Sequence, residues 1–169
     1  ANHLEAYHTL CLKKKKDIVR NDLYLLGVSN YKIKNYEKAI GYLKEIKQEA
    51  DSISENACLH LGHSYLRVND IEKAKLAYSA AIQFNITPAL REEAMYNYVQ
   101  VTYLQNSALG EGIVAFQLFI KEYPNSKYIV AKKENEIIGF AGIWKAVDDI
   151  HITNIVVKKS FRNKGIGSI

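Results

Sequence analysis

The sequence has few prolines and cysteines and no long hydrophobic run. Two prolines, nine glycines and no low-complexity tract argue against large disordered regions. Cys11 and Cys58 are too few for a disulfide framework, so we expect small buried thiols in a reducing compartment. No run of 18 apolar residues occurs, which predicts no membrane span. What remains is a chain with 48% hydrophobic residues, enough to build a packed core.

The start of the chain lacks the apolar segment of a signal peptide, because Lys13 to Lys16 interrupt it. We therefore expect a cytoplasmic location. A periplasmic or secreted location stays open, because the sequence begins at Ala1 and its start could be processed. The lysine run is interpreted as a solvated helix face, since no aromatic residues are interleaved, and no nucleic-acid partner is predicted.

The stretch from Ala57 to Phe84 contains two amphipathic helical patterns separated by Asn69-Asp70, with Asp70 suited to cap the second helix. The unit recurs: Leu26-Gly27 lies 35 residues before Leu61-Gly62, and Ala39 lies 35 residues before Ala74. The two glycines would let the helices of each hairpin approach closely. The spacing of Ser52 and Glu55 indicates a capping box before the second hairpin.

These residues resemble the tetratricopeptide (TPR) family, through Leu-Gly in the first helix and Lys-Ala in the second. A degenerate third copy runs from Ala94 to Pro124, with Thr87 as cap and Pro88 at the first helical position. Gly112 occupies a site where the family prefers alanine. Inside a helix, glycine should lower stability by about 1 kcal/mol relative to alanine. The resemblance implies about three hairpins plus a leading helix over residues 1–127.

His60 and His63 lie three residues apart on one helix face, a spacing that would let both bind one metal ion. Cys58 lies on a different side of that helix, so no third ligand is available nearby. We predict no metal site, and interpret the histidines as a polar groove lining or an exposed face. Most of the tyrosines, including Tyr42, Tyr65 and Tyr78, fall on helix stripes and are predicted to pack in the core.

The pattern changes near Tyr128, where three short β-type runs separated by turns predict an antiparallel meander up to Val157. The fold class is therefore mainly α: a solenoid of antiparallel helical hairpins followed by a small β meander. The net charge is +5, and Lys158, Lys159, Arg162 and Lys164 concentrate the basic excess at the end of the chain.

The last strand is followed by Arg-x-x-Gly-x-Gly, in which glycines let backbone N–H groups approach a pyrophosphate. This stretch resembles the acetyl-CoA motif of the GNAT family of N-acetyltransferases, closest to the RimI-like enzymes that acetylate ribosomal-protein amino termini. The resemblance implies a partial GNAT α/β fold over residues 128–169. It assigns pantetheine binding to Ile155, Val156 and Val157, and pyrophosphate binding to Arg162, Asn163, Lys164, Gly165, Ile166 and Gly167.

Three interpretations of function follow. The first is a protein-binding TPR scaffold whose groove receives a peptide or partner helix, with a GNAT segment that is incomplete and not catalytically competent. The second is a GNAT-type N-acetyltransferase acting on a protein amino terminus or a small amine, with acetyl-CoA as cofactor. The third is a chimera of two fragments joined between Tyr123 and Tyr128. No catalytic residue and no oligomeric state are assigned.

Overall fold

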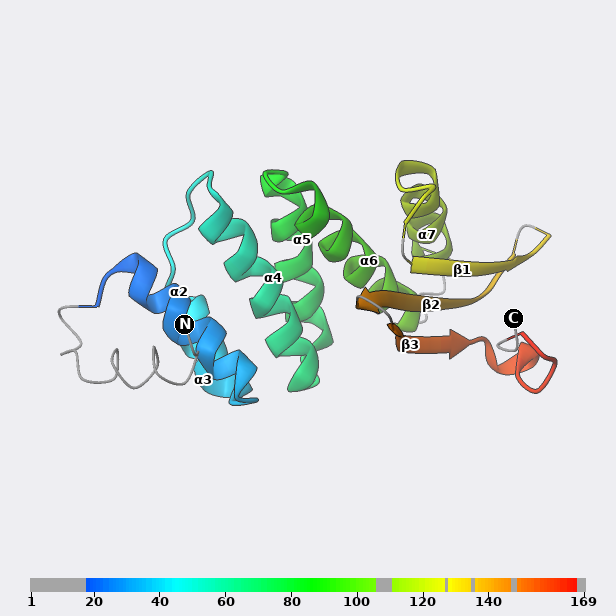
Figure 1. The fold of residues 1–169 in the computed structure, drawn as a ribbon, viewed down its shortest axis with the longest axis horizontal. Coiled ribbons are helices and arrows are strands. Elements are labelled where there is room, and N and C mark those ends of the chain that lie inside the picture. Colours follow the sequence, from blue (N-terminus) through cyan, green and yellow to red (C-terminus); the bar gives the residue numbers. More distant parts are fainter. Residues whose placement is uncertain (1–17, 106–110, 127, 135, 147–148, 167–169) are drawn as a thin grey trace. The chain divides into compact units, whose positions relative to one another are not determined.

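The computed structural model describes residues 18–105, 111–126, 128–134, 136–146 and 149–166 (Figure 1). Within them helices come first and strands follow, which confirms the predicted fold class. The helices are α2 (Arg20–Lys32), α3 (Tyr36–Leu43), α4 (Ser52–Arg67), α5 (Ile71–Phe84), α6 (Pro88–Leu104) and α7 (Glu111–Glu122). The strands are β1 (Tyr128–Lys133), β2 (Glu136–Ala146) and β3 (Asp149–Val157), and a short 3-10 helix, η2 (Lys159–Phe161), follows them.

The chain divides into two compact units, Ala1–Val101 and Thr102–Ile169, and each is described by itself. The change of sequence pattern predicts a domain boundary after residue 127, and this boundary stays a prediction. The predicted leading helix, with its lysine run from Lys13 to Lys16, lies largely outside the described residues, as does Cys11. In the described part of the chain, no helix combines the length and the apolar character that crossing a bilayer requires.

The two hairpins of the first unit, α2 with α3 and α4 with α5, are built on equivalent contacts. A Cβ atom added to Gly27 would lie 2.5 Å from the Leu43 side chain, and one added to Gly62 would lie 2.5 Å from the Tyr78 ring. Leu43 and Tyr78 are themselves 35 residues apart. The predicted role of the glycines in close helix approach is confirmed.

Buried side chains on the predicted stripes form the core of each hairpin. Ala39 and Ala74, which are 35 residues apart, are both completely buried. Tyr78 is also completely buried, and Tyr65 packs against the same cluster. The first cluster contains Ala39, Leu43, Ile46 and Ala57, and the second contains Cys58, Leu59, Ala74, Tyr78, Ala81, Ala94 and Val101.

The predicted capping box before α4 is wrong. The N-cap residue is Asp51, whose carboxylate accepts a hydrogen bond from the Ser54 N–H at 2.9 Å. Arg20 at the start of α2 donates two hydrogen bonds to the Asp51 carboxylate, at 2.7 and 2.8 Å, and holds the pKa of that carboxyl well below its usual range. Because this paired aspartate supplies the cap, Ser52 becomes the first residue of the helix.

Glu55, the second member of the predicted box, has a different role. Its side chain is completely buried and accepts hydrogen bonds from the Ile86 N–H at 3.0 Å and from the Thr87 N–H at 3.0 and 3.1 Å. The carboxylate therefore anchors the connection between α5 and α6. Pro88 opens α6 and the Asp70 carboxylate caps α5, both as predicted.

In the second unit, Gly112 of α7 allows close packing. From the sequence alone, this glycine was instead interpreted as an unfavourable replacement of alanine. A Cβ atom at this position would lie 2.5 Å from the Cα atom of Tyr103, so an alanine would meet backbone. Tyr103, Phe116 and Phe140 form an aromatic core, with ring centroids 4.8 to 5.6 Å apart. This core joins α7 to the sheet.

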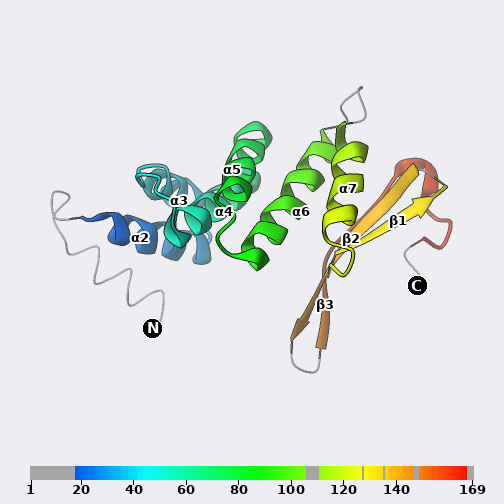
Figure 2. The same cartoon turned by 90° about the horizontal axis from the view of Figure 1, so that it is seen from above.

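The sheet has the order β1-β2-β3 with antiparallel neighbours, which confirms the predicted meander (Figure 2). Gly139, Phe140 and Ala141 lie opposite Val157, Val156 and Ile155. Ile137, Ile138 and Phe140 are buried, so the middle strand adds apolar side chains to the core that α7 also lines. β3 is left as an edge strand in the described residues.

Candidate functional site

The free edge of β3 carries backbone groups that point away from the sheet. The Lys158 N–H donates to the Ile138 carbonyl at 2.8 Å, which makes these two residues a hydrogen-bonded pair. Hydrogen-bonded and non-bonded pairs alternate along an antiparallel ladder, so Val156 also faces β2. Ile155 and Val157 therefore direct their N–H and C=O groups to the open edge.

The loop after β3 turns sharply within a few residues. The Phe161 N–H donates to the Lys158 carbonyl at 2.8 Å, and Arg162 Nε donates to the Val157 carbonyl at 3.0 Å. The guanidinium thus ties the loop back to the open edge of the strand.

Asn163 and Gly165 have left-handed backbone conformations, with φ of 60° and 74°. A Cβ atom on Gly165 would meet nothing within 4 Å, so there is space for a larger side chain. The position favours glycine because of its left-handed backbone conformation. Left-handed residues that alternate with others turn successive N–H groups to one side and form a concave anion site.

Basic side chains surround this loop, and one of them is already neutralised. Lys158 forms a hydrogen-bonded ion pair with Glu136, and the hydrogen bond raises the pKa of Lys158. The Lys164 ammonium lies 5.3 Å from the centroid of the Phe161 ring, and the Lys133 ammonium lies 5.7 Å from the same centroid. The loop is therefore strongly electropositive and open to solvent.

The structure places the predicted site residues on one continuous segment. Ile155 is 53% exposed, and Val156 and Val157 are half-buried. The loop residues Arg162, Asn163, Lys164 and Gly165 are exposed, and Ile166 is half-buried. Gly167 lies outside the described residues. The roles assigned to these residues stay predictions.

Sequence reasoning missed Lys133, Glu136 and Phe161. Lys133 and Glu136 flank the turn between β1 and β2, and the register of β2 on β3 brings that turn beside Lys158. Because these residues lie more than 20 positions from the loop, the motif itself carried no sign of them. Pairing the last two predicted strands in an antiparallel register could have placed Lys133 and Glu136 near the loop.

A second cluster of polar groups lies in the repeat unit, on the first helix of each successive hairpin. Tyr31 of α2 stacks on the His63 ring at 6.0 Å and meets the His60 ring edge-on at 5.2 Å, both on α4. His63 Nδ1 lies 2.9 Å from the Tyr78 hydroxyl, and its Nε2 lies 3.3 Å from a carboxylate oxygen of Glu93 on α6. The histidines therefore lie on a half-buried polar face: they are not exposed, and neither lines the open groove along α4 and α5.

His60 is the more enclosed histidine, and burial lowers its pKa to about 4. Its Nδ1 lies 3.0 Å from the Asn56 carbonyl, which is satisfied by a neutral imidazole that carries a proton on Nδ1. Across the residues that the structure describes, no three histidine, cysteine or acidic side chains are grouped so as to hold a metal ion.

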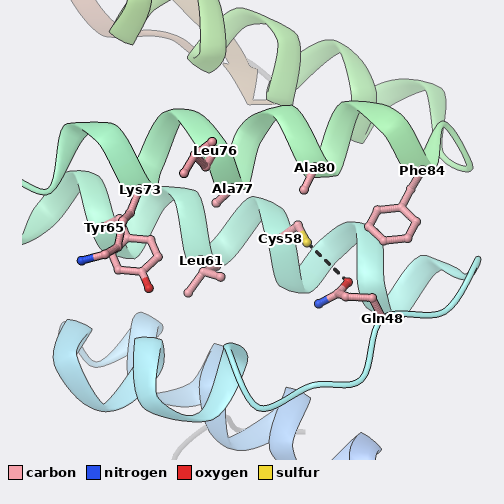
Figure 3. A pocket seen from close by; sticks show the side chains of 9 residues that line it. All are labelled: Gln48, Cys58, Leu61, Tyr65, Lys73, Leu76, Ala77, Ala80 and Phe84. Atoms are coloured by element: carbon pink, nitrogen blue, oxygen red, sulfur yellow. Dashed lines mark hydrogen bonds between the residues drawn. The ribbon is translucent and has the colours of Figure 1, made fainter.

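An open apolar groove of about 460 Å³ lies along α4 and α5 (Figure 3). The Cys58 thiol donates to Gln48 Oε1 at 3.5 Å, and burial raises the pKa of this thiol to about 11. Cys58 is therefore a buried, protonated thiol, as predicted. The groove is lined by Gln48, Cys58, Leu61, Tyr65, Lys73, Leu76, Ala77, Ala80 and Phe84.

Comparison with known proteins supports both resemblances. Residues 23–52 match the tetratricopeptide repeat model, and residues 92–169 match the model of the acetyltransferase (GNAT) family. The second match begins within α6 and includes α7, which the sequence analysis placed in a third repeat.

A protein of Bacillus subtilis (strain 168), provisionally named a ribosomal protein bS18-alanine N-acetyltransferase, is 39% identical to the chain over 46 residues. This stretch is 27% of the chain and 30% of that protein, so the chain spans less than a third of its relative's length.

Proposed function

We propose that β3 and the loop after it bind acetyl-CoA for N-acetyl transfer, on the premise that this chain carries a tetratricopeptide repeat followed by a GNAT-family acetyltransferase segment. The observation that carries the proposal is the open edge of β3, continued directly by a loop with two left-handed residues and several cations. The acceptor is a primary amine, at a protein amino terminus or on a small molecule.

The residues fit the parts of this cofactor. Ile155 offers outward backbone N–H and C=O groups and Val157 offers an outward N–H, at the spacing of a β strand, which suits pairing with the amides of a pantetheine arm, while the Val157 carbonyl accepts from Arg162. The backbone N–H groups from Asn163 to Ile166 suit a pyrophosphate. The backbone of Val156 was also predicted to hold the pantetheine arm, but its N–H and C=O groups face β2.

Acetyl-CoA supplies an activated acetyl thioester, which an amine can attack. The residues named here bind and orient that group. The Arg162 side chain holds the loop against the Val157 carbonyl, and the Glu136 carboxylate holds the Lys158 ammonium group. Arg162 and Glu136 therefore shape the site before a ligand enters. We assign no residue to proton transfer.

Calorimetric titration with acetyl-CoA at low salt tests the proposal on three proteins: the wild type, Gly165→Asn and Gly165→Asp. Asparagine tolerates the left-handed conformation, and aspartate is nearly the same size but adds a negative charge. We expect saturable binding to the wild type, weaker binding to the asparagine variant and none to the aspartate variant. Unchanged binding to the aspartate variant, or no binding to the wild type, overturns the proposal.

A second function is favoured by the cluster of Tyr31, His60, His63 and Glu93, which draws its side chains from three successive first helices. We propose that this face of the repeat unit binds a protein or peptide. The proposal stands also if the chain transfers no acetyl group, or if the two segments come from separate proteins.

Affinity capture with the wild type and with Tyr31→Ala tests the second function. Leu76→Ala is the control, because it removes a 70% exposed apolar side chain from the separate groove on α4 and α5. A partner retained by the control and lost by Tyr31→Ala supports the proposal. Equal capture by all three proteins, or no partner at any reachable concentration, contradicts it.

A further inference from the structure

Two lysines from different parts of the second unit converge on one aromatic ring. Lys133 is the last residue of β1, and Lys164 belongs to the loop after η2. Their ammonium groups lie 5.7 and 5.3 Å from the centroid of the Phe161 ring. The ring thus gathers two positive charges beside the loop, one of which lies outside the recognised motif.

The backbone fixes the position of the ring. The Lys158 N–H bonds the Ile138 carbonyl, and the Phe161 N–H bonds the Lys158 carbonyl, each at 2.8 Å. The ring therefore stays at the end of β2 and β3, beside the turn that carries Lys133.

Acidic groups nearby balance only part of this charge. Glu136 forms its ion pair with Lys158, and Glu134 follows Lys133 as an exposed residue in a left-handed conformation. An ammonium group near an aromatic face is attracted by the ring quadrupole, which positions the ammonium group without removing its charge. Both ammonium groups keep their positive charge at 5.7 and 5.3 Å from one ring centroid, so an anion that binds beside this ring is attracted by both lysines.

We propose that Lys133 and Lys164, held by Phe161, bind a phosphomonoester of the ligand that stands apart from its pyrophosphate. In acetyl-CoA this group is the 3′-phosphate of the adenosine. The inference rests on the proposed acetyl-CoA site and adds a specificity to it: the chain prefers acetyl-CoA to its 3′-dephospho form, and Lys133 is a residue that makes this distinction.

The test compares dissociation constants for acetyl-CoA and 3′-dephospho-acetyl-CoA by calorimetry at one ionic strength. The proteins are the wild type, Lys133→Ala and the control Lys121→Ala, which removes an exposed lysine of α7 and changes the net charge equally. We expect the wild type and the control to bind acetyl-CoA about three- to tenfold more tightly than the dephospho form. Lys133→Ala should lose most of this preference through weaker binding of acetyl-CoA alone.

Phe161→Leu provides a second variant and should lower the preference in the same way, because it removes the ring that holds both lysines. Equal weakening of both ligands by Lys133→Ala, or a wild type without preference, overturns the inference and leaves the acetyl-CoA site standing. A wild type that binds neither ligand refutes the site and the inference together.

Discussion

The same chemical change, glycine to alanine, should have opposite effects at two helical positions of the repeat unit. A Cβ atom at Gly62 of α4 would lie 2.5 and 2.6 Å from atoms of the Tyr78 ring, which is completely buried and held by its hydroxyl contact with His63. At Gly41 of α3 nothing lies within 4 Å of the added atom. The two sites therefore separate packing from helix propensity.

The expected changes in the free energy of unfolding follow from helix propensity and packing. Alanine in place of a helical glycine gains up to about 1 kcal/mol at both sites. At Gly62 the ring cannot move aside, so overpacking costs about 1–3 kcal/mol, and we place it near the upper end because the contact is more than 1 Å too short. Gly41→Ala should raise the free energy of unfolding by up to about 1 kcal/mol, and Gly62→Ala should lower it by about 1–2 kcal/mol.

Urea unfolding followed by far-ultraviolet circular dichroism measures both variants, since the hairpins carry helical signal. A change of 1 kcal/mol corresponds to about 4–8 °C in the melting temperature of a unit of this size, so thermal scans give an independent check. Two variants that shift stability in the same direction would refute the packing argument. A stabilised Gly62→Ala would show in addition that α4 and α5 are not pressed together at this position.

Three further predictions concern single buried groups. Glu55→Gln keeps one oxygen for the Ile86 N–H but replaces the second carboxylate oxygen with an amide NH2 that meets the Thr87 N–H, and it should destabilise the chain by about 1–3 kcal/mol. The exposed Glu45→Gln should change stability by less than about 0.5 kcal/mol in the same urea experiment, and equal effects would contradict the anchor. Gly112→Ala meets the Tyr103 backbone and should speed amide hydrogen exchange in α7, while exchange at the wild-type rate would disprove the close contact. The pKa of His60 is about 4 in the folded chain against an ordinary 6.5, so the unfolded chain binds the proton first, and stability should fall by about 3 kcal/mol from pH 6.5 to pH 4. His60→Gln should flatten this part of the pH profile, and a wild-type profile already flat there would contradict the burial of a neutral imidazole.

The acidic end of that profile has a separate cause. The Arg20 guanidinium lowers the pKa of Asp51 below its ordinary value of 3.8, so the stability from this pair is complete above pH 4 and is lost at lower pH. The two contributions therefore fall in different pH windows, which lets one titration distinguish them.

The amino-acid sequence by itself determined the features that depend on neighbours within one or two helical turns. Helical stripes, the Asp70 cap, Pro88 at the start of α6 and the 35-residue recurrence of Gly27 and Gly62 all follow from local spacing, and the structure confirms them. The alternation and turns after Tyr128 likewise predict the meander. Such features are readable because each residue's partner lies a few positions away or one repeat away.

Only the tertiary structure decided the features whose partners lie far along the chain. Arg20 selects Asp51 as the cap across 31 residues, and this contact overrides the box that Ser52 and Glu55 suggest. Glu55 is thereby free to reach the connection before α6, 31 residues away. No local pattern encodes these pairings, because they arise when helices are already packed and a buried charged group must find its donors.

The same distinction applies to the candidate site. The motif from Arg162 to Gly167 could be recognised from spacing alone, because the glycine pattern and the preceding strand are contiguous. The register of β2 on β3 decided that the backbone of Ile155 and Val157, but not of Val156, faces the open edge. The register also brought Lys133 to the Phe161 ring. A shift of one residue would reverse every backbone and side-chain direction on the strand, so this part of the site depends on strand pairing and not on the motif.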